Sequence, residues 1–130
     1  MLKVHTLNDR LCPHTNNAAH GVEIPPGARL LFTNGQVGAR QDGTVPRDIV
    51  EQFEVIFERL GHVLAASAMG FADVVKLTVY VTDKAHLEAF HRVRPGRMKH
   101  HNPAATMLVV GPFPRPGVEA EVEVIAAKAG

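Results

Sequence analysis

The chain has 130 residues, of which 45% are hydrophobic and 21% charged, and its net charge at pH 7 is +1. These values are typical of one globular domain, spanning residues 1–130, and exclude the disordered and collagen-like classes. The single cysteine, Cys12, excludes an intrachain disulfide. Because no apolar run approaches the roughly 18 residues of a membrane helix, we expect a cytoplasmic protein without a membrane partner.

The first third of the chain predicts short strands separated by turns. A short strand is expected at residues 2–7, and residues 13–21 (PHTNNAAHG) are rich in turn formers and predict irregular structure. Residues 21–38 predict two short strands around the Pro25-Pro26-Gly27 turn, and Asn34-Gly35 indicates a break or bulge.

A long amphipathic helix is predicted from Pro46 onward. Its apolar residues recur at three- and four-residue steps and form one stripe: Ile49, Val50, Phe53, Ile56, Phe57, Leu60, Val63 and Leu64. Pro46 suits the first helical turn, and Gly70 suits the position just beyond the last turn.

The second half of the chain predicts strand, helix and two further strands. Residues 72–83 alternate between apolar and polar side chains, as in a strand. Asp83 is expected to cap a second helix that ends at Pro95-Gly96, and strands are expected at 106–110 and 118–126. The order β-β-α-β-α-β-β predicts an α+β fold, with two helices on one face of a mixed sheet. Packing against copies of the same chain would cover the other face.

Three glutamates in the last strand are the first candidates for chemistry. Glu119, Glu121 and Glu123 stand at two-residue spacing on one face. Glu119, next to a turn, is expected at a solvated edge. Glu123 lies among apolar neighbours, and burial beside another carboxylate would raise its pKa into the range of a general acid or base.

The eight histidines do not predict a metal site. His86 and His91 are five residues apart and do not share a helix face, and no HExxH arrangement is present. We therefore expect no metal, and His91 is interpreted as a residue at the edge of a cleft. The basic cluster of Arg92, Arg94, Arg97 and Lys99 gives weak support for nucleic-acid binding, which we consider unlikely.

Four segments together resemble the RidA/YjgF/UK114 family of enamine/imine deaminases. They are LLFTNGQVG (30–38), residues 42–83, NPAATMLVVGPFP (102–114) and VEAEVEVIAA (118–127). The resemblance implies a chorismate-mutase-like fold, a homotrimer with a central barrel, and clefts between subunits. It also implies hydrolysis of a small imine or enamine to a keto acid and ammonia, without a metal or organic cofactor.

The resemblance also implies roles for individual residues. Glu123 matches the glutamate that positions the attacking water, and Ala105 occupies the position of the arginine that holds the substrate carboxylate. The other substrate-binding positions implied are Asn34, Gly35, Gln36, His91, Thr106 and Met107, with Ala18 or a neighbour near the cleft.

The alanine at position 105 weakens the expectation of the family's usual substrate. A bidentate guanidinium contact contributes about 1.5–3 kcal/mol per charged hydrogen bond, and a methyl group provides none of it. We then expect a substrate that is neutral, larger or more apolar at this point, unless Arg92, Arg94 or Arg97 replaces the anchor. Two alternatives to the enzyme remain: a trimer that binds a small metabolite without turnover, and a trimer that interacts with proteins or RNA.

Overall fold

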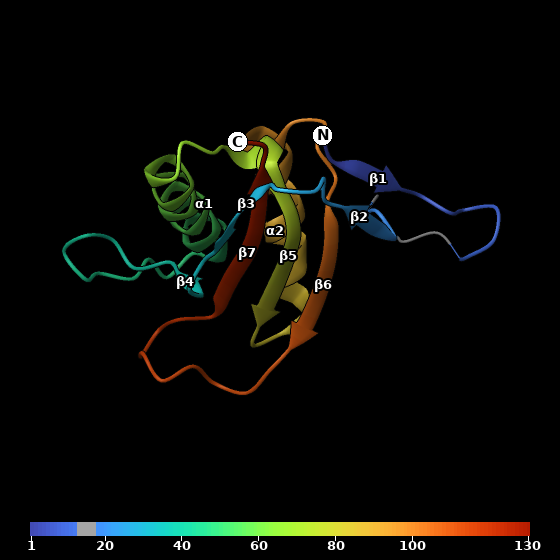
Figure 1. The fold of residues 1–130 in the computed structure, drawn as a ribbon. Helices are drawn as coiled ribbons and strands as arrows, with labels where there is room; N and C mark the ends of the chain where they lie inside the picture. The colour runs from blue at the N-terminus through green and yellow to red at the C-terminus, as the bar shows by residue number, and fades with distance from the viewer. Residues whose placement is uncertain (13–17) are drawn as a thin grey trace.

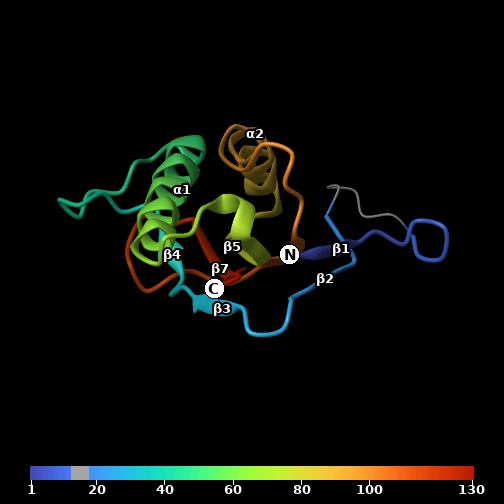
Figure 2. The same cartoon turned by 45° about the horizontal axis from the view of Figure 1, so that its top comes forward.

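The computed structural model describes residues 1–12 and 18–130, so part of the expected irregular segment, residues 13–17, lies outside it. Two helices cover one face of a mixed sheet, as Figures 1 and 2 show, which confirms the expected α+β class. The elements are β1 (Lys3–His5), β2 (Gly21–Glu23), β3 (Arg29–Phe32), β4 (Gln36–Val37), α1 (Ile49–Ala66), η1 (Phe71–Asp73), β5 (Val74–Val81), η2 (Lys84–His86), α2 (Leu87–Met98), β6 (Ala104–Val109) and β7 (Ala120–Lys128).

The main sheet has five strands in the order β3-β7-β5-β6, with β4 also pairing with β7. β5 and β6 are parallel because α2 lies between them in the chain, and the other pairs are antiparallel. β2 and β3 do flank the Pro25-Pro26-Gly27 turn, but they do not pair with each other. β2 instead pairs with β1 in a separate two-stranded sheet beside the main body (Figure 1). The short strand β4, directly after Asn34-Gly35, was not expected.

The first helix is shorter at both ends than the sequence predicts. It begins after Asp48, whose carboxylate accepts a hydrogen bond of 3.1 Å from the Glu51 N–H. It ends with two bonds typical of a left-handed C-terminal cap, to the carbonyl groups of Ala65 and Leu64, and Ala68 takes the positive φ of 55°. The prediction that Gly70 occupies this position was therefore wrong.

The second helix continues past the predicted stop. Asp83 caps η2, which leads into α2, and α2 then includes Pro95 and ends at Met98. A proline within a helix removes its own N–H as a donor and crowds the carbonyl group four residues earlier, yet α2 continues for three residues past Pro95. The carbonyl group of Pro95 still accepts a 2.9 Å hydrogen bond from Lys99, whose φ of 54° ends the helix. β6 and β7 are both displaced by about two residues from their predicted ranges.

The core lies between the helices and the covered face of the sheet. Phe90 of α2 packs edge-on against Phe53 and stacks on Phe57 of α1, with ring centroids 5.6 and 6.0 Å apart. The predicted stripe on α1 supplies most of the helical contribution to this core, and β5 and β7 supply the strand contribution. In the part of the chain that the structure describes, no helix has the length and apolar character needed to cross a membrane.

Gln52 is a fully buried polar residue that joins the start of α1 to the start of β7. Its Nε2 group donates hydrogen bonds of 2.9 Å to the carbonyl oxygens of Pro46 and Gly117, and its Oε1 atom accepts one of 3.0 Å from the Glu119 N–H. Gly38 passes close to it: a Cβ atom at position 38 would lie 2.8 Å from the Gln52 Cα. One side chain therefore fixes the backbone just before β7.

We expect Gln52→Met to lower the free energy of unfolding by about 3 kcal/mol, because it leaves three backbone groups without partners in or near the core. Chemical denaturation measures this change. Gln41→Met, at an exposed glutamine, is the matched control and should change stability by less than about 0.5 kcal/mol. Equal effects of the two substitutions would contradict the role assigned to Gln52.

Candidate active site

The face of the sheet that the helices leave open carries the two candidate carboxylates. Along β7, Ala120, Val122 and Val124 are buried under the helices, so Glu121 and Glu123 point to the opposite face. Across the sheet, Thr78 of β5 pairs with Glu123 and Tyr80 pairs with Glu121. This surface, formed by the outward residues of β3, β5, β6 and β7, is called the open face below.

Glu123 is held by a hydrogen bond on the open face. The Tyr80 hydroxyl donates to Glu123 Oε1 at 2.7 Å, and this bond, with smaller effects of burial and of the nearby carboxylates, raises the pKa of the Tyr80 phenol. Tyr80 therefore stays protonated and serves as a donor to Glu123.

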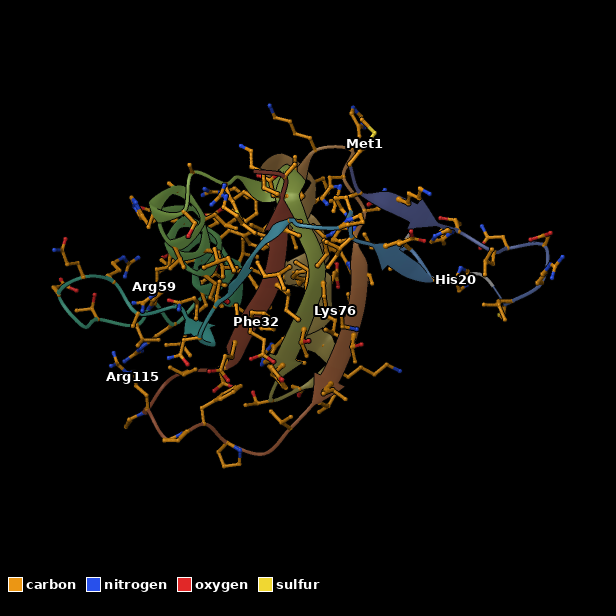
Figure 3. All side chains as sticks on the ribbon, in the orientation of Figure 1. Met1, His20, Phe32, Arg59, Lys76 and Arg115 are labelled. Carbon is orange, nitrogen blue, oxygen red and sulfur yellow. The ribbon has the colours of Figure 1, made fainter. Side chains whose placement is uncertain are left out.

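A hollow of about 130 Å³ lies beside Glu123. Its charged lining groups are Glu123 and Lys76, and the Lys76 ammonium donates a 2.6 Å hydrogen bond to the Thr106 hydroxyl. Figure 3 shows Phe32 and Lys76 lying over the middle strands of the sheet. The hollow thus offers one cation and one carboxylate, with Phe32, Thr33, Thr78, Val124 and Ile125 completing its walls.

Glu121 is the open-face glutamate whose pKa is perturbed. Burial, and then the neighbouring charge of Glu123, raises the pKa of the Glu121 carboxyl above its ordinary value. Its side chain lies against the backbone of Gly35, where an added Cβ atom would stand 2.3 Å from Glu121 Oε1. The sequence indicates a raised pKa for Glu123 and not for Glu121, although their two-residue spacing places both side chains on one face.

The three residues 34–36 divide between the open face and the helices. Gly35 contacts Glu121 as described, whereas Gln36 pairs with Val122 and is buried toward α1. Gln36 Oε1 accepts a 3.0 Å hydrogen bond from Arg59 Nε, and its Nε2 group donates to the Asn34 carbonyl oxygen at 3.3 Å. The side chain of Gln36 is thus occupied in holding β4 against α1.

The predicted residues of β6 also lie on two faces. Thr106 pairs with Thr78 and belongs to the open face. Ala105 and Met107 pair with Leu77 and Val79, and both pack against the core on the helix side. Within one chain the structure therefore does not bring Ala105 or Met107 together with Glu123. Ala18, beside this strand, is buried next to the bridge between Ala19 and Ala104.

His91 lies on α2, on the helix side of the sheet and away from the open face. Burial, and then the charge of Arg94, lowers its pKa, so its ring is neutral at pH 7. Arg94, one of the proposed substitutes for the missing arginine, is itself engaged. Its Nη2 group donates to Asn102 Oδ1 at 2.7 Å and to the His101 carbonyl oxygen at 3.3 Å.

Glu119 is not the purely solvated residue that was expected. Its side chain is 44% exposed, accepts a hydrogen bond from the Thr82 hydroxyl, and lies 3.5 Å from His86 Nε2. Among residues 1–12 and 18–130, no group of three or more His, Cys, Asp or Glu side chains is arranged to hold a metal ion.

Comparison with known proteins relates this arrangement to one family. The Endoribonuclease L-PSP family matches residues 19–128. The chain is 26% identical over 103 residues to the putative reactive intermediate deaminase TdcF of Escherichia coli K12, covering 76% of this chain and 79% of TdcF. It is 43% identical over 54 residues to the E. coli RutC family protein YjgH, a match that spans 42% of this chain and 41% of YjgH.

A solved structure shows the same fold. The Rid-family protein YyfB of Yersinia pestis, whose function is described as unknown, superposes with a TM-score of 0.86 over 98% of each chain at 25% sequence identity. The matched family spans most of the chain, and the structural likeness covers nearly all of it. The chain therefore belongs to the RidA/YjgF/UK114 family, to which the Endoribonuclease L-PSP description refers.

Proposed function

We propose that this protein is a cofactor-free hydrolase that deaminates a small imine, enamine or related conjugated metabolite. The observation that carries the proposal is the Glu121–Glu123 pair on the open face, in which burial and the neighbouring carboxylate raise the pKa of Glu121. A carboxyl group that holds its proton closer to neutral pH can both accept and return one during a reaction. The name of the relative TdcF, a putative reactive intermediate deaminase, supports the same reaction class.

The two glutamates can divide the work of hydrolysis. Glu121 stands on the same face as Glu123 but is not a lining residue of the hollow. In the proposed reaction its carboxylate accepts a proton from the water that Glu123 orients, as the water oxygen bonds to the iminium carbon and the C=N electron pair moves to nitrogen. The resulting carbinolamine receives that proton on nitrogen, the C–N bond breaks, and the departing ammonia takes up the hydroxyl proton, which leaves a keto product and ammonium. Glu123, fixed by Tyr80, is placed to orient the water.

The groups around the hollow restrict the substrate that this site would accept. A hollow of about 130 Å³ corresponds to the liquid volume of roughly four water molecules, so only a small molecule or one end of a larger one fits. Lys76 supplies a positive charge beside Glu123 that can attract a carboxylate. Arg94 is less suited to that role because it already binds Asn102 and His101.

The proposed substrate cleft lies between subunits of a homotrimer. Glu123 and Thr106 belong to the open face, whereas Ala105, Met107 and His91 belong to the helix side, so one chain alone does not unite them. Large apolar side chains at both edges of the sheet are exposed, with Phe32 at 67% and Val109 at 56%. Apolar surface of this kind is typical of an association surface.

We expect the protein in solution to have three times the 14.1 kDa mass of the chain, measured by sedimentation or light scattering. Phe32→Glu places a charge on the exposed apolar surface and should dissociate the assembly. Leu7→Glu, at an exposed leucine outside the main sheet, is the control and should leave the mass unchanged. A monomeric wild-type protein would contradict the proposed intersubunit cleft.

We expect Glu121→Gln to lower kcat for imine hydrolysis by about 100-fold or more, the usual contribution of general acid–base catalysis. Glu123→Gln should have a smaller effect, about tenfold, because the amide can still orient water. Ammonia release from 2-iminobutyrate, generated in place by a dehydratase, measures both. Glu54→Gln, on the exposed side of α1, is the control for loss of a carboxylate.

The order of the two effects assigns the proton-transferring group. A larger loss for Glu123→Gln would return that role to Glu123, as the sequence indicates. If neither substitution slows the hydrolysis of any imine that the protein accepts, the proposed mechanism is wrong. If the wild-type protein binds the imine without releasing ammonia, it is a binding protein.

We also expect Glu121→Gln to stabilise the protein at high pH. A raised folded-state pKa means that ionised Glu121 opposes folding. This loss of stability appears as the pH rises from the ordinary glutamate pKa of 4.5 through the folded-state pKa, and it is absent below pH 4.5. The melting temperature of Glu121→Gln relative to wild type should thus be higher at pH 8 than at pH 4. The effect should be under about 1 kcal/mol because Glu121 is partly solvated. A difference that does not grow with pH would contradict the assigned cause.

A further inference from the structure

A second hollow lies on the helix side of the sheet, between α1 and the loop that follows β4. It has a volume of about 460 Å³, within the range of roughly 300–1,000 Å³ found for small-molecule sites. Its charged and titratable lining groups are Arg40, Glu58, Arg59 and His62, and Ala39, Gln41 and Val55 complete it. None of these residues has a part in the proposed hydrolysis.

Arg59 is fixed at this hollow by two hydrogen bonds. Its Nε group donates to Gln36 Oε1 at 3.0 Å, and its Nη1 group donates to the Ala39 carbonyl oxygen at 2.7 Å. Both acceptors are uncharged, and no carboxylate in residues 1–12 and 18–130 lies within ion-pair distance of the guanidinium. Figure 3 places Arg59 beside β4. The half-buried positive charge is therefore oriented but not neutralised.

The loop on the other side of the hollow is held in place by its own hydrogen bonds. The Arg40 N–H donates to the Thr44 carbonyl oxygen at 2.9 Å, and Gly43 has a positive φ of 87° that allows the tight turn. Asp42 accepts hydrogen bonds from the Thr44 N–H and hydroxyl at 2.9 and 2.7 Å. Because this wall is already ordered, a ligand would not have to order it on binding.

Among the charged groups of the hollow, Arg59 is the one best placed to bind a ligand. Arg40 is paired with Glu51 at 3.3 Å, which partly offsets its charge. Glu58 is an acidic lining residue, but its side chain is exposed and forms no ion pair with Arg59 among the described contacts. A guanidinium that needs a counter-ion forms strong paired hydrogen bonds with carboxylate and phosphate oxygens.

We propose that the hollow between α1 and residues 39–41 is a binding site for a small carboxylate or phosphate anion, with Arg59 as its principal ligand. Arg40 and His62 stand at its wall as secondary donors, and Glu58 limits the negative charge that the site accepts. The site is separate from the imine-hydrolysing site, and its existence does not depend on that activity.

The test is calorimetric titration of the assembled wild-type protein with inorganic phosphate and, separately, with succinate at low ionic strength. We expect saturable binding of at least one of the two anions, and which one binds identifies the ligand chemistry. Arg59→Gln should weaken that binding by about tenfold or more, because a charged donor to the anion is lost. Glu58→Gln should tighten it by about threefold, because a repelling charge is removed.

Matched variants keep the test interpretable. Arg47→Gln removes an exposed arginine that does not line the hollow and should leave binding unchanged. If Arg59→Gln fails to fold by circular dichroism, Arg40→Gln combined with His62→Gln replaces it and should weaken binding by about threefold. Absence of saturable binding to either anion, or equal affinities of wild type and the variants that remove positive charge from the hollow, would overturn the proposal.

Discussion

The three hydrogen bonds of Gln52 fix the relative positions of the segments from which the proposed active site is built. They join the start of α1 to Pro46, Gly117 and Glu119, in the core and at its margin. Gly38 can approach Gln52 because it has no Cβ atom, so the segment after β4 packs at the same point. Glu121 lies two residues after Glu119, and Gly35 lies three residues before Gly38. The contact between Gly35 and Glu121 on the open face therefore depends on Gln52, which is buried under the helices.

The chemistry of the open face results from covering only one side of the sheet. β7 must present small and branched apolar side chains to the helices, and strand alternation then directs Glu121 and Glu123 to the other side. Partial burial, and then the neighbouring charge of Glu123, oppose the ionisation of Glu121 and raise its pKa. Glu121 therefore keeps its proton to a higher pH than a solvated glutamate does. A fully solvated pair would be more stable and less useful for proton transfer.

The patterns that were predicted correctly are those set by local periodicity. The apolar stripe of α1 and the alternation in β5 identify both buried faces. The two-residue period also separates Ala105 from Thr106, which the family resemblance assigned to one site. The features that were missed depend on contacts distant in sequence. β4 forms only because β7 supplies its partner, and the pKa of Glu121 depends on burial that adjacent residues do not reveal. The passage of α2 through Pro95 is a separate case, because it is a local departure from the usual helix-stopping effect of proline.

Gln36 connects the two proposed sites. Its side chain accepts the hydrogen bond from Arg59, while its backbone continues from Gly35, which lies against Glu121. An anion that draws the guanidinium toward itself would weaken the bond to Gln36, and Gly35 has little freedom to move because the Glu121 carboxylate is in contact with it. The strain would then reach Glu121, the carboxyl group that we propose to transfer the proton. A bound anion would thus affect the proposed hydrolysis through the position of Glu121.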